Sequence, residues 1–417
     1  MDNSSVKEIA QRSKKASRSL IGLLSPEKAK ALKAMATALR NNTAFLQEEN
    51  DKDIKNAVKN SLNTAMIDRL RLTDKVIESM AAALEEIADL PDPVGKITGM
   101  IKRPNGLMVG RMKIPIGVIG MIYESRPNVT SDAAGLCLKS GNAVILRGGS
   151  EAFHSNMAII GMLKRSLSDS GIDPDVIGFI PVTDRQAVMD MLSLEEYIDL
   201  IIPRGGEGLI RTVVQNSKIP VLKHYKGVCH VFVDQDADFD KAYRICLNSK
   251  VHRPGVCNAM ETLLVDSKIA GSFLPEVIDM FKKSSVEIRG CDKTREIVPD
   301  ITPAAEQDWY EEFLDLILAV KVVEDMDEAI DHIEKYGSDH TEAIITENYT
   351  RAMEFLRQVD SSTVLVNAST RFSDGGEFGL GAEVGISTSK IHAYGPMGIE
   401  DLTIEKFICF GDGQIRQ

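Results

Sequence analysis

The residue with the clearest chemical potential in this sequence is Cys257. It lies in the segment Arg253-Pro-Gly-Val-Cys-Asn258, directly before a run of apolar residues. Proline fixes φ and glycine tolerates unusual backbone angles, so the segment predicts a sharp turn that presents the sulfur at the edge of a strand. His252 and Arg253 would favour the thiolate and lower the pKa of the thiol, while Asn258 and backbone N–H groups could hold an oxyanion. An average cysteine is more often a buried structural residue, but the turn and the charges favour a nucleophile here.

A second candidate is the glycine-rich segment Pro203-Arg-Gly-Gly-Glu-Gly208, which follows an apolar run and begins a helical pattern. Backbone N–H groups at the start of a helix attract anions, so Gly205 and Gly206 are candidates for contact with cofactor phosphates. The segment is not a G-x-G-x-x-G motif, and an ordinary strand-to-helix turn remains the alternative. The cysteines at 137, 229, 246, 257, 291 and 409 show no metal-ligand spacing, so no metal site is expected.

The elements that must position these residues are predicted by the pattern of apolar runs. From Pro115 onward, short apolar runs alternate with helical segments, as in a parallel sheet buried on both faces. Strands are expected at 115–123, 143–146, 176–180 and 198–202, and a second series at 231–233, 263–265, 317–323, 343–345 and 364–366. This succession predicts two α/β domains, the first a doubly wound domain of the dinucleotide-binding type.

The two ends of the chain differ from this pattern. Ser25 is expected to cap one helix, with Pro26 in its first turn, and Thr73 is expected to begin another. Residues 368–398 are rich in glycine, and 402–410 alternate like a half-exposed strand near the C-terminus. The exposed edge of such a strand invites pairing with another chain.

Length, charge and composition narrow the function. The chain has 417 residues, which are enough for two or three domains without disulfides. Its net charge of −12 argues against nucleic acid as a partner. No apolar stretch is long enough to span a membrane, and the first residues lack the apolar core of a signal peptide. We therefore expect a cytoplasmic protein without membrane contact.

Several motifs, spread over most of the chain, point to one family. They are Tyr123-Glu-Ser-Arg-Pro-Asn-Val-Thr130, Arg253-Pro-Gly-Val-Cys-Asn-Ala259, Asn367-Ala-Ser-Thr-Arg-Phe372, Gly375-Gly-Glu-Phe-Gly-Leu-Gly381 and Gly411-Asp-Gly-Gln-Ile-Arg416. Each motif alone is weak, but together they are specific. The sequence resembles the aldehyde dehydrogenase superfamily, and within it the branch that reduces L-glutamyl 5-phosphate. One departure is His252, where relatives carry glutamine.

The resemblance implies an activity and a mechanism. Cys257 would attack the acyl phosphate carbon of L-glutamyl 5-phosphate, phosphate would leave, and NADPH would deliver hydride to the resulting thioester. The product would be L-glutamate 5-semialdehyde, the second step of proline biosynthesis from glutamate. Covalent catalysis suits this chemistry because sulfur is both a good nucleophile and a good leaving group. The alternatives are another acylating aldehyde dehydrogenase, for instance one that uses coenzyme A, or a catalytically silent binding protein on the same scaffold.

The resemblance also implies roles for particular residues. Asn128 would donate its side-chain amide to the oxyanion, and Glu312 would hold the nicotinamide ribose, although an acid in this segment could equally be a solvated one. Arg147 would sit at the adenosine ribose, where a cation suits the 2′-phosphate of NADPH, or it could be an ordinary strand-end arginine. Ser150 and Glu151 could contact the same ribose or cap a helix. Gly205 and Gly206 match the glycine turn beside the cofactor phosphates.

The anionic groups of the substrate require cations. Arg126 and Arg371 are the best candidates, because guanidinium groups bind carboxylates and phosphates in a bidentate manner. Hydrolytic relatives place a water-activating glutamate at a position that falls here on His224, in a stretch that also contains Lys223 and Lys226. This cationic stretch favours phosphate over water as the acceptor of the acyl group.

The expected organisation follows from the resemblance. A Rossmann-type NADP-binding domain would span 1–225, interrupted by an oligomerisation hairpin near 103–114. An α/β catalytic domain would span 226–366, and a glycine-rich return segment with a C-terminal oligomerisation strand would span 367–417. Family members pair such strands between subunits, so a homo-oligomer is expected. Because acyl phosphates are labile, a transient contact with glutamate 5-kinase is also conceivable.

Overall fold

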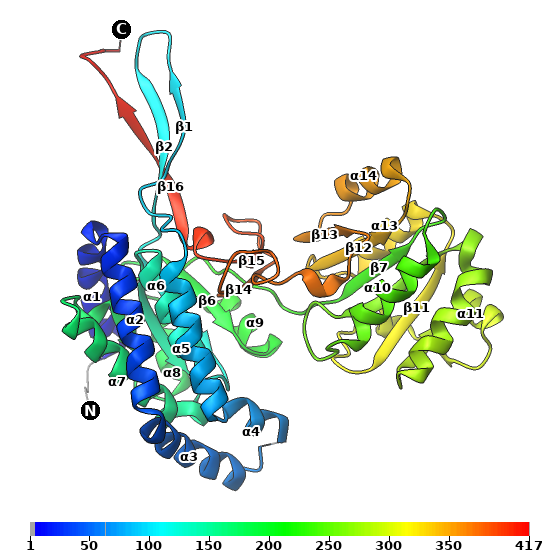
Figure 1. Cartoon of the computed structure of the whole chain (residues 1–417), viewed down its shortest axis with the longest axis horizontal. Helices are drawn as coiled ribbons and strands as arrows, with labels where there is room; N and C mark the ends of the chain where they lie inside the picture. Colours follow the sequence, from blue (N-terminus) through cyan, green and yellow to red (C-terminus); the bar gives the residue numbers. More distant parts are fainter. Residues whose placement is uncertain (1–4, 63, 417) are drawn as a thin grey trace.

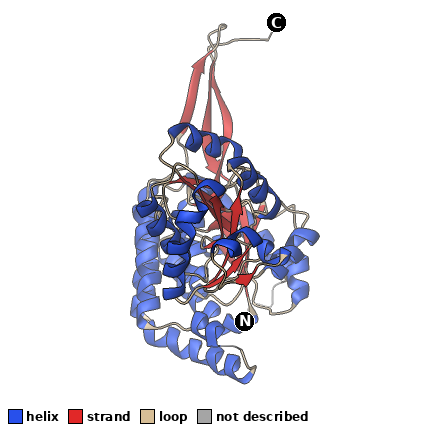
Figure 2. Ribbon diagram, turned by 90° about the vertical axis from the view of Figure 1, so that its right-hand side faces the viewer, coloured by secondary structure: helices blue, strands red, loops and turns tan. Residues whose placement is uncertain are grey.

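The computed structural model describes residues 5–62 and 64–416. These residues form two lobes that lie side by side and an arm that projects away from the first lobe (Figure 1). A view turned by 90° shows the sheets of the lobes in the interior, covered by helices, with the arm standing free and bearing the C-terminal end (Figure 2).

The first lobe begins with helices. The sequence starts them with clear signals: Ser5 caps the first helix and Thr73 caps the fifth, each through its side-chain oxygen. The cap expected at Ser25 is wrong by one residue, because Leu24 is the extended residue before the helix and Ser25 is already helical. The helices are α1 (Val6–Ala16), α2 (Ser25–Asn41), α3 (Thr43–Lys59), α4 (Thr64–Leu70) and α5 (Asp74–Asp89).

A parallel sheet with the order β5-β4-β3-β6 forms the centre of the first lobe. Its strands are nearly all buried, as their unbroken apolar runs predict. The strands are β3 (Val118–Tyr123), β4 (Ala143–Gly148), β5 (Ile177–Phe179) and β6 (Leu200–Arg204), and the helices that follow them are α6 (Asn128–Lys139), α7 (Phe153–Asp169), α8 (Arg185–Leu192) and α9 (Glu207–Asn216). All strand pairs in this sheet are parallel, so their carboxyl ends meet at one edge.

The second lobe contains a larger parallel sheet with the order β10-β9-β11-β8-β7-β12-β13. Its strands are β7 (Cys229–Val233), β8 (Met260–Asp266), β9 (Glu287–Gly290), β10 (Thr302–Pro303), β11 (Ile317–Val323), β12 (Thr341–Ile345) and β13 (Thr363–Val366). Helices α10 (Phe239–Val251), α11 (Ser267–Lys283), α12 (Asp292–Ile297), α13 (Met326–Tyr336) and α14 (Tyr349–Gln358) connect and cover them. Short 3-10 turns, such as η4 (Glu306–Tyr310), complete the lobe.

The arm is an antiparallel sheet of β1 (Ile97–Lys102), β2 (Met108–Pro115) and β16 (Thr403–Phe410). The hairpin is thus somewhat longer than the 103–114 expected, and the strand expected to start at 115 is divided between β2 and β3. The return segment contains the short pair β14 (Gly385–Ser387) and β15 (Gly395–Met397). Apolar residues of this segment, among them Val384 and Met397, pack into the core of the first lobe. The chain therefore crosses back from the second lobe before it enters the arm.

Three further observations concern the described residues. The cysteines among them are free thiols. They contain no cluster of three or more His, Cys, Asp or Glu side chains arranged to bind a metal ion. None of their helices has both the length and the apolar character needed to cross a membrane.

Candidate active site

Cys257 lies on the loop between α10 and β8, and its side chain is half-buried. Two contacts to the Cys257 carbonyl oxygen hold the loop in place. The Cys229 thiol donates a hydrogen bond to the Cys257 carbonyl oxygen, with 3.1 Å between sulfur and oxygen. A Cβ atom at Gly227 would lie 1.8 Å from the same oxygen, so only glycine fits where the chain enters β7. The turn predicted from the sequence is therefore clamped against the end of a neighbouring strand.

The expected low pKa of the Cys257 thiol is not found. Burial, followed by the nearby carboxylates of Glu312 and Glu383, raises this pKa to about 11. Arg204 is the charged side chain that lowers it most, whereas His252 and Arg253 are not among the main causes. The prediction that His252 and Arg253 favour the thiolate is wrong, because loss of hydration at the half-buried sulfur outweighs their charge. The thiol is protonated at neutral pH in this structure.

Asn128 begins α6 at the carboxyl edge of the first sheet. Its side-chain amide donates one hydrogen bond to Asp132 Oδ2 at 3.1 Å, which leaves its second N–H free for a ligand. The turn before it is strained, since Ser125 has a φ of +46°. The Glu151 carboxylate stabilises this turn by accepting hydrogen bonds from Ser125 N at 2.5 Å and Ser125 Oγ at 2.9 Å. Glu151 thus holds the turn that presents Arg126 and Asn128, and neither it nor Ser150 caps the following helix.

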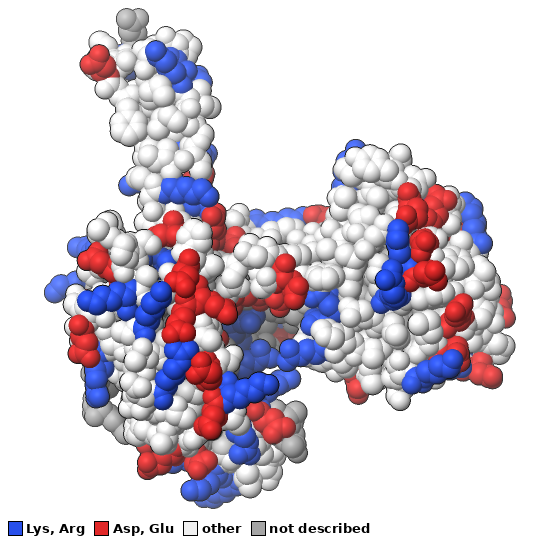
Figure 3. Space-filling model, viewed as in Figure 1, with Lys and Arg blue, Asp and Glu red and all other residues white. Residues whose placement is uncertain are grey.

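Arginines from separate segments gather around Cys257. Partial desolvation and the neighbouring cations Arg204, Arg69 and Arg253 lower the pKa of Arg126. Burial and Arg253 likewise lower the pKa of Arg371, while Asp374 and the Cys257 sulfur raise it. Figure 3 shows Lys and Arg side chains in the hollow between the lobes. The sequence predicted Arg126 and Arg371 here, but it gave no signal for Arg69 or Arg204.

These guanidinium groups are free to bind a ligand. The side chains of Arg126, Arg204, Arg253 and Arg371 make no hydrogen bond or ion pair with any residue that the structure describes. The Nε atom of Arg371 is buried without a partner within the same described residues. A buried donor without a partner is costly, so these groups are suited to an anionic ligand.

The glycine turn at the start of α9 is occupied by a carboxylate. Glu124 Oε2 accepts a hydrogen bond from Gly206 N at 3.0 Å, and a Cβ atom at Gly205 would lie 2.4 Å from the same oxygen. A larger residue at 205 would therefore displace the Glu124 and Leu209 side chains. A cofactor phosphate can reach these N–H groups only when Glu124 turns away.

Arg147 lies at the end of β4 and is nine-tenths buried. Its Nη2 atom donates to the carbonyl oxygens of Thr183, at 2.9 Å, and Asp184, at 3.4 Å. Burial is the main cause that lowers the pKa of Arg147, and Arg185 contributes to it, so a second cation lies near. Arg185 is exposed at the start of α8, and the sequence gave no indication of its place beside Arg147.

Glu312 lies close to the loop that carries Cys257. Its Oε1 atom accepts a hydrogen bond from Gly227 N at 2.9 Å. Burial raises the pKa of Glu312, and its carboxylate in turn raises the pKa of the Cys257 thiol. The solvated acid considered as an alternative is not what the structure shows. The segment that carries Glu312 is anchored two residues later, where Leu314 N donates a hydrogen bond to Glu261. Glu261 also forms a buried ion pair with Lys250.

Two other expectations about polar residues change. Asn258 donates its side-chain amide to the Ser373 carbonyl oxygen at 2.9 Å, so it fastens the return segment instead of facing an oxyanion. His224 donates from Nδ1 to the Ile386 carbonyl oxygen at 3.1 Å. Burial, with the nearby Arg204, lowers the pKa of His224 to about 4. His224 is therefore neutral, and any positive charge of the stretch 223–226 comes from Lys223 and Lys226, as predicted.

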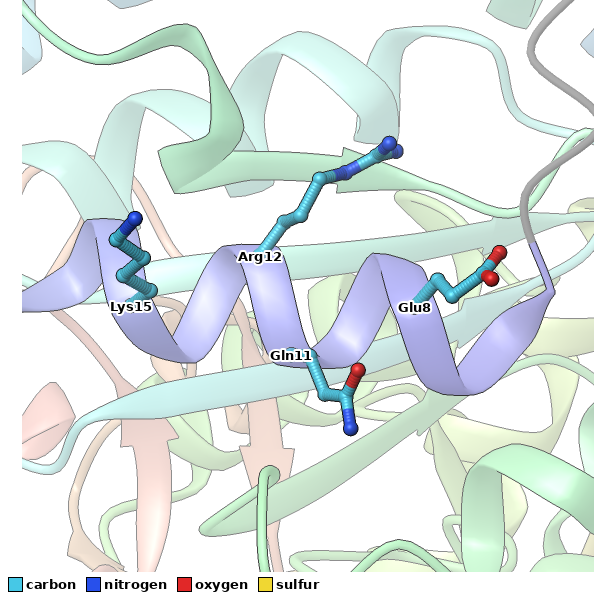
Figure 4. A pocket seen from close by; sticks show the side chains of 4 residues that line it. All are labelled: Glu8, Gln11, Arg12 and Lys15. Atoms are coloured by element: carbon cyan, nitrogen blue, oxygen red, sulfur yellow. The ribbon is translucent and has the colours of Figure 1, made fainter.

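Two surface hollows of the described residues lie away from Cys257. One, of about 460 Å³, is lined by Glu8, Gln11, Arg12 and Lys15, which project from α1 (Figure 4). Another, of about 400 Å³, lies beside β9 and β10. The chemistry-bearing residues instead line the open space between the lobes.

The fold and this site define the class of the protein. A family model described as aldehyde dehydrogenase family matches residues 1–314. A crystal structure of an acetylating aldehyde dehydrogenase from Geobacillus thermoglucosidasius has the same fold, with a TM-score of 0.67 at 18% identity over 99% of this chain and 97% of that one. The chain belongs to the aldehyde dehydrogenase family and is an oxidoreductase; the family uses nicotinamide cofactors.

Nearer relatives define the branch. The gamma-glutamyl phosphate reductase of Desulfatibacillum aliphaticivorans is 59% identical over 414 residues, covering 99% of both chains. That of Geobacter metallireducens is 57% identical over 412 residues, again covering 99% of both. The crystal structure of gamma-glutamyl phosphate reductase from Thermotoga maritima superposes with a TM-score of 0.97 at 47% identity, covering 99% of this chain and 100% of that one. Within the aldehyde dehydrogenases, the chain thus falls in the gamma-glutamyl phosphate reductase branch.

Proposed function

We propose that this protein uses NADPH to reduce L-glutamyl 5-phosphate to L-glutamate 5-semialdehyde and phosphate, through a thioester on Cys257. The reaction is the second step of proline biosynthesis from glutamate. The observation that supports it best is the group of unpartnered guanidinium groups around a half-buried thiol. A substrate with a carboxylate at one end and an acyl phosphate at the other needs both. The relatives do not favour the coenzyme A-dependent or catalytically silent alternatives.

The side chains present can perform the acyl transfer. Cys257 Sγ attacks the acyl carbon, the S–C bond forms, and the C–O bond to phosphate breaks; phosphate leaves with the electron pair and takes up the thiol proton. The free N–H of Asn128 stabilises the oxyanion, while Asp132 fixes the orientation of its amide. When bound, the nicotinamide cofactor supplies the hydride that reduces the thioester. The Cys257 sulfur then departs from the aldehyde carbon and recovers a proton.

The choice of NADPH rests on the residues at the adenosine end of the cleft. Arg147 is held by backbone carbonyl groups, and its buried Nε atom has no partner within residues 5–62 and 64–416. A guanidinium group placed in this way fits the 2′-phosphate of NADPH. Ser150 would contact the adenosine ribose, which carries this 2′-phosphate, and Glu312 would approach the nicotinamide ribose. Gly205 and Gly206 would offer the start of α9 to the cofactor phosphates.

The protein's partners are part of the proposal. The arm exposes apolar side chains, among them Ile101, Phe407 and Phe410, which are 59%, 67% and 58% exposed. Exposed apolar strands of this kind favour association with a second copy, so we expect a homo-oligomer joined through the arm. The labile substrate favours a transient contact with glutamate 5-kinase, and the expected location is the cytoplasm.

The acceptor of the acyl group provides the test. In the reverse direction, L-glutamate 5-semialdehyde and NADP⁺ should yield NADPH continuously only when inorganic phosphate is present. Activity is measured in phosphate-free buffer and again after phosphate is added back. Sustained turnover without phosphate would show that water accepts the acyl group, and the proposal would give way to a hydrolytic aldehyde dehydrogenase.

A further inference from the structure

Arg204 is the last residue of β6, and its side chain lies against the return segment. A Cβ atom at Gly385 would lie 3.0 Å from Arg204 Nη1 and 3.4 Å from Arg204 Cζ, so the guanidinium group packs on the backbone of β14. Gly385 also has a φ of +152°, which disfavours other residues there. The next residue, Ile386, accepts the hydrogen bond from His224. Arg204 is therefore fixed where the first lobe meets the return segment.

The groups that face Arg204 come from every neighbouring element. Burial raises the pKa of Asp132 on α6, of Glu383 in the return segment and of the Cys257 thiol, and the charge of Arg204 opposes each of these shifts. In the stretch before β7, burial lowers the pKa of His224, and Arg204 adds to that shift. Arg126 is the nearby cation. The Arg204 side chain is half-buried, yet it makes no hydrogen bond or ion pair with any described residue. Such a cation is prepared for an anion that arrives with the substrate.

The position of Arg204 indicates which anionic group of the substrate, the phosphate or the α-carboxylate, it would contact. The acyl carbon must lie next to Cys257 Sγ for attack, and the phosphate is joined to that carbon. The α-carboxylate lies at the far end of the substrate. Arg204 pairs with Tyr123 across β6 and β3, and its carbonyl oxygen accepts a hydrogen bond from Glu124 N at 3.1 Å, so it lies beside the turn that presents Asn128 toward the acyl carbon. The Cys257 sulfur also acts on Arg371, but Arg204 is the cation that lowers the pKa of the thiol most. Arg204 is thus placed for the phosphate, and Arg371 for the carboxylate.

We propose that Arg204 binds the phosphoryl group of the substrate as it leaves the acyl carbon and, in the reverse reaction, binds the inorganic phosphate that attacks the thioester. In that reverse step a phosphate oxygen forms the C–O bond, the C–S bond breaks, and sulfur leaves as the thiolate. The guanidinium group neutralises charge on the phosphate oxygens and holds the attacking oxygen near the carbon. This inference rests on the proposed function.

The test compares Arg204→Gln, Arg204→Lys and Arg371→Gln with the parent protein. In the reverse assay, Arg204→Gln should raise the KM for phosphate at least about tenfold, with the KM for the semialdehyde changed less than about twofold, because one charge-assisted contact is lost. Arg204→Lys should recover part of the phosphate affinity, since it keeps the charge but not the forked geometry. Arg371→Gln should show the opposite pattern. Arg244→Gln on the exposed face of α10 removes the same charge and serves as the control.

A second measurement needs neither turnover nor cofactor. Phosphate should slow the alkylation of Cys257 by iodoacetamide in the parent protein, and the concentration for half protection should rise about tenfold in Arg204→Gln. Thermal unfolding of each variant identifies any that fail to fold. If Arg204→Gln does not fold, the phosphate KM and the protection measured for Arg204→Lys test the role of Arg204. An unchanged phosphate KM and unchanged protection would overturn the role of Arg204, and so would a selective rise in the semialdehyde KM. If the parent protein itself turns over without phosphate, the proposed function fails and not merely this assignment.

Discussion

The space between the lobes has a proposed adenosine end, at Arg147, and a proposed nucleophile end, at Cys257. The arginines at these two ends differ in how their guanidinium groups are bound. At the adenosine end, Arg147 is nine-tenths buried and its guanidinium group is held by the carbonyl oxygens of Thr183 and Asp184. At the end proposed to hold the nucleophile, the guanidinium groups of Arg204 and Arg371 have no hydrogen-bond or ion-pair partner among the described residues. Backbone carbonyl groups fix the Arg147 side chain in the ligand-free protein. The guanidinium groups of Arg204 and Arg371 would gain their hydrogen bonds only from a bound ligand.

This difference indicates that the Arg147 site is more preorganised for its ligand than the site around Cys257. Arg147 is held in place before a cofactor binds, which reduces the ordering cost of its contact, whereas Glu124 must still turn away from the start of α9. The nucleophile end is left incomplete, and its thiol is protonated because burial raises the pKa of Cys257 to about 11. A thiol in this state is protected from oxidants, which attack thiolates. We infer that arrival of the substrate completes both the cation contacts and the activation of the sulfur.

The largest effect is expected from Cys257→Ser. The hydroxyl is nearly the same size but hardly ionises at neutral pH, so turnover should fall by at least about 10³-fold. NADPH binding and thermal unfolding should change little, because the loop is held through its backbone. Steady-state rates and NADPH fluorescence titration measure both properties. Cys409→Ser, at the exposed thiol of the arm, is the matched control, and appreciable activity in Cys257→Ser would exclude the nucleophile assignment.

Asn128→Ala should have the next largest effect. It removes an oxyanion donor, so kcat should fall by about 10²–10³-fold while KM changes little. Initial rates over a range of semialdehyde concentrations separate the two constants. If only KM rose, Asn128 would be a substrate-binding residue, and the oxyanion would be stabilised by backbone N–H groups alone.

Much of the fold could be predicted from the sequence. The strand 317–323 has the bounds expected, because its apolar pattern is strong and flanking residues mark its ends. The prediction did not include β9, β10 or α14. Strand β10 forms the sheet edge and β9 lies next to it; both are short and carry exposed residues, so their apolar pattern is weak. Helix α14 has only Ala352 and Phe355 buried, so its apolar face gives little signal.

The site was less predictable, for a physical reason. Cys257 and Asn128 belong to recognisable motifs, whereas Arg204 lies in a glycine-rich segment that predicts anion binding by its backbone N–H groups. Its importance arises only when the return segment brings Gly385 against it. The pKa of Cys257 was also misjudged, because local charge is visible in a sequence whereas burial is not. Contacts between segments far apart in the chain determine what the motif residues can do.

Arg147→Gln tests the other end of the cleft. Loss of the guanidinium group should weaken NADPH binding about tenfold, with little change for NADH, because the contact is to the 2′-phosphate. Fluorescence titration with both cofactors measures this directly, and 2′,5′-ADP should compete less well with NADPH in the variant. Arg165→Gln, exposed on α7, provides the control for a change of charge. Equal losses for both cofactors would show that Arg147 only supports the loop at Thr183.

The smallest effect, and the sharpest test of the protonated thiol, concerns pH. Because the pKa of Cys257 is about 11, the rate of its alkylation in the ligand-free protein should rise with pH without a plateau below pH 10. The Glu312 carboxylate repels the thiolate and raises this pKa, so Glu312→Gln should move the profile to lower pH by about one unit. Arg204→Gln removes a cation that stabilises the thiolate and should move it to higher pH. Glu311→Gln, at the exposed neighbouring acid, should leave the profile in place. A plateau near pH 9 in the parent protein would show an ordinary thiol, and the contrast between the two ends of the cleft would then lie in the arginines alone.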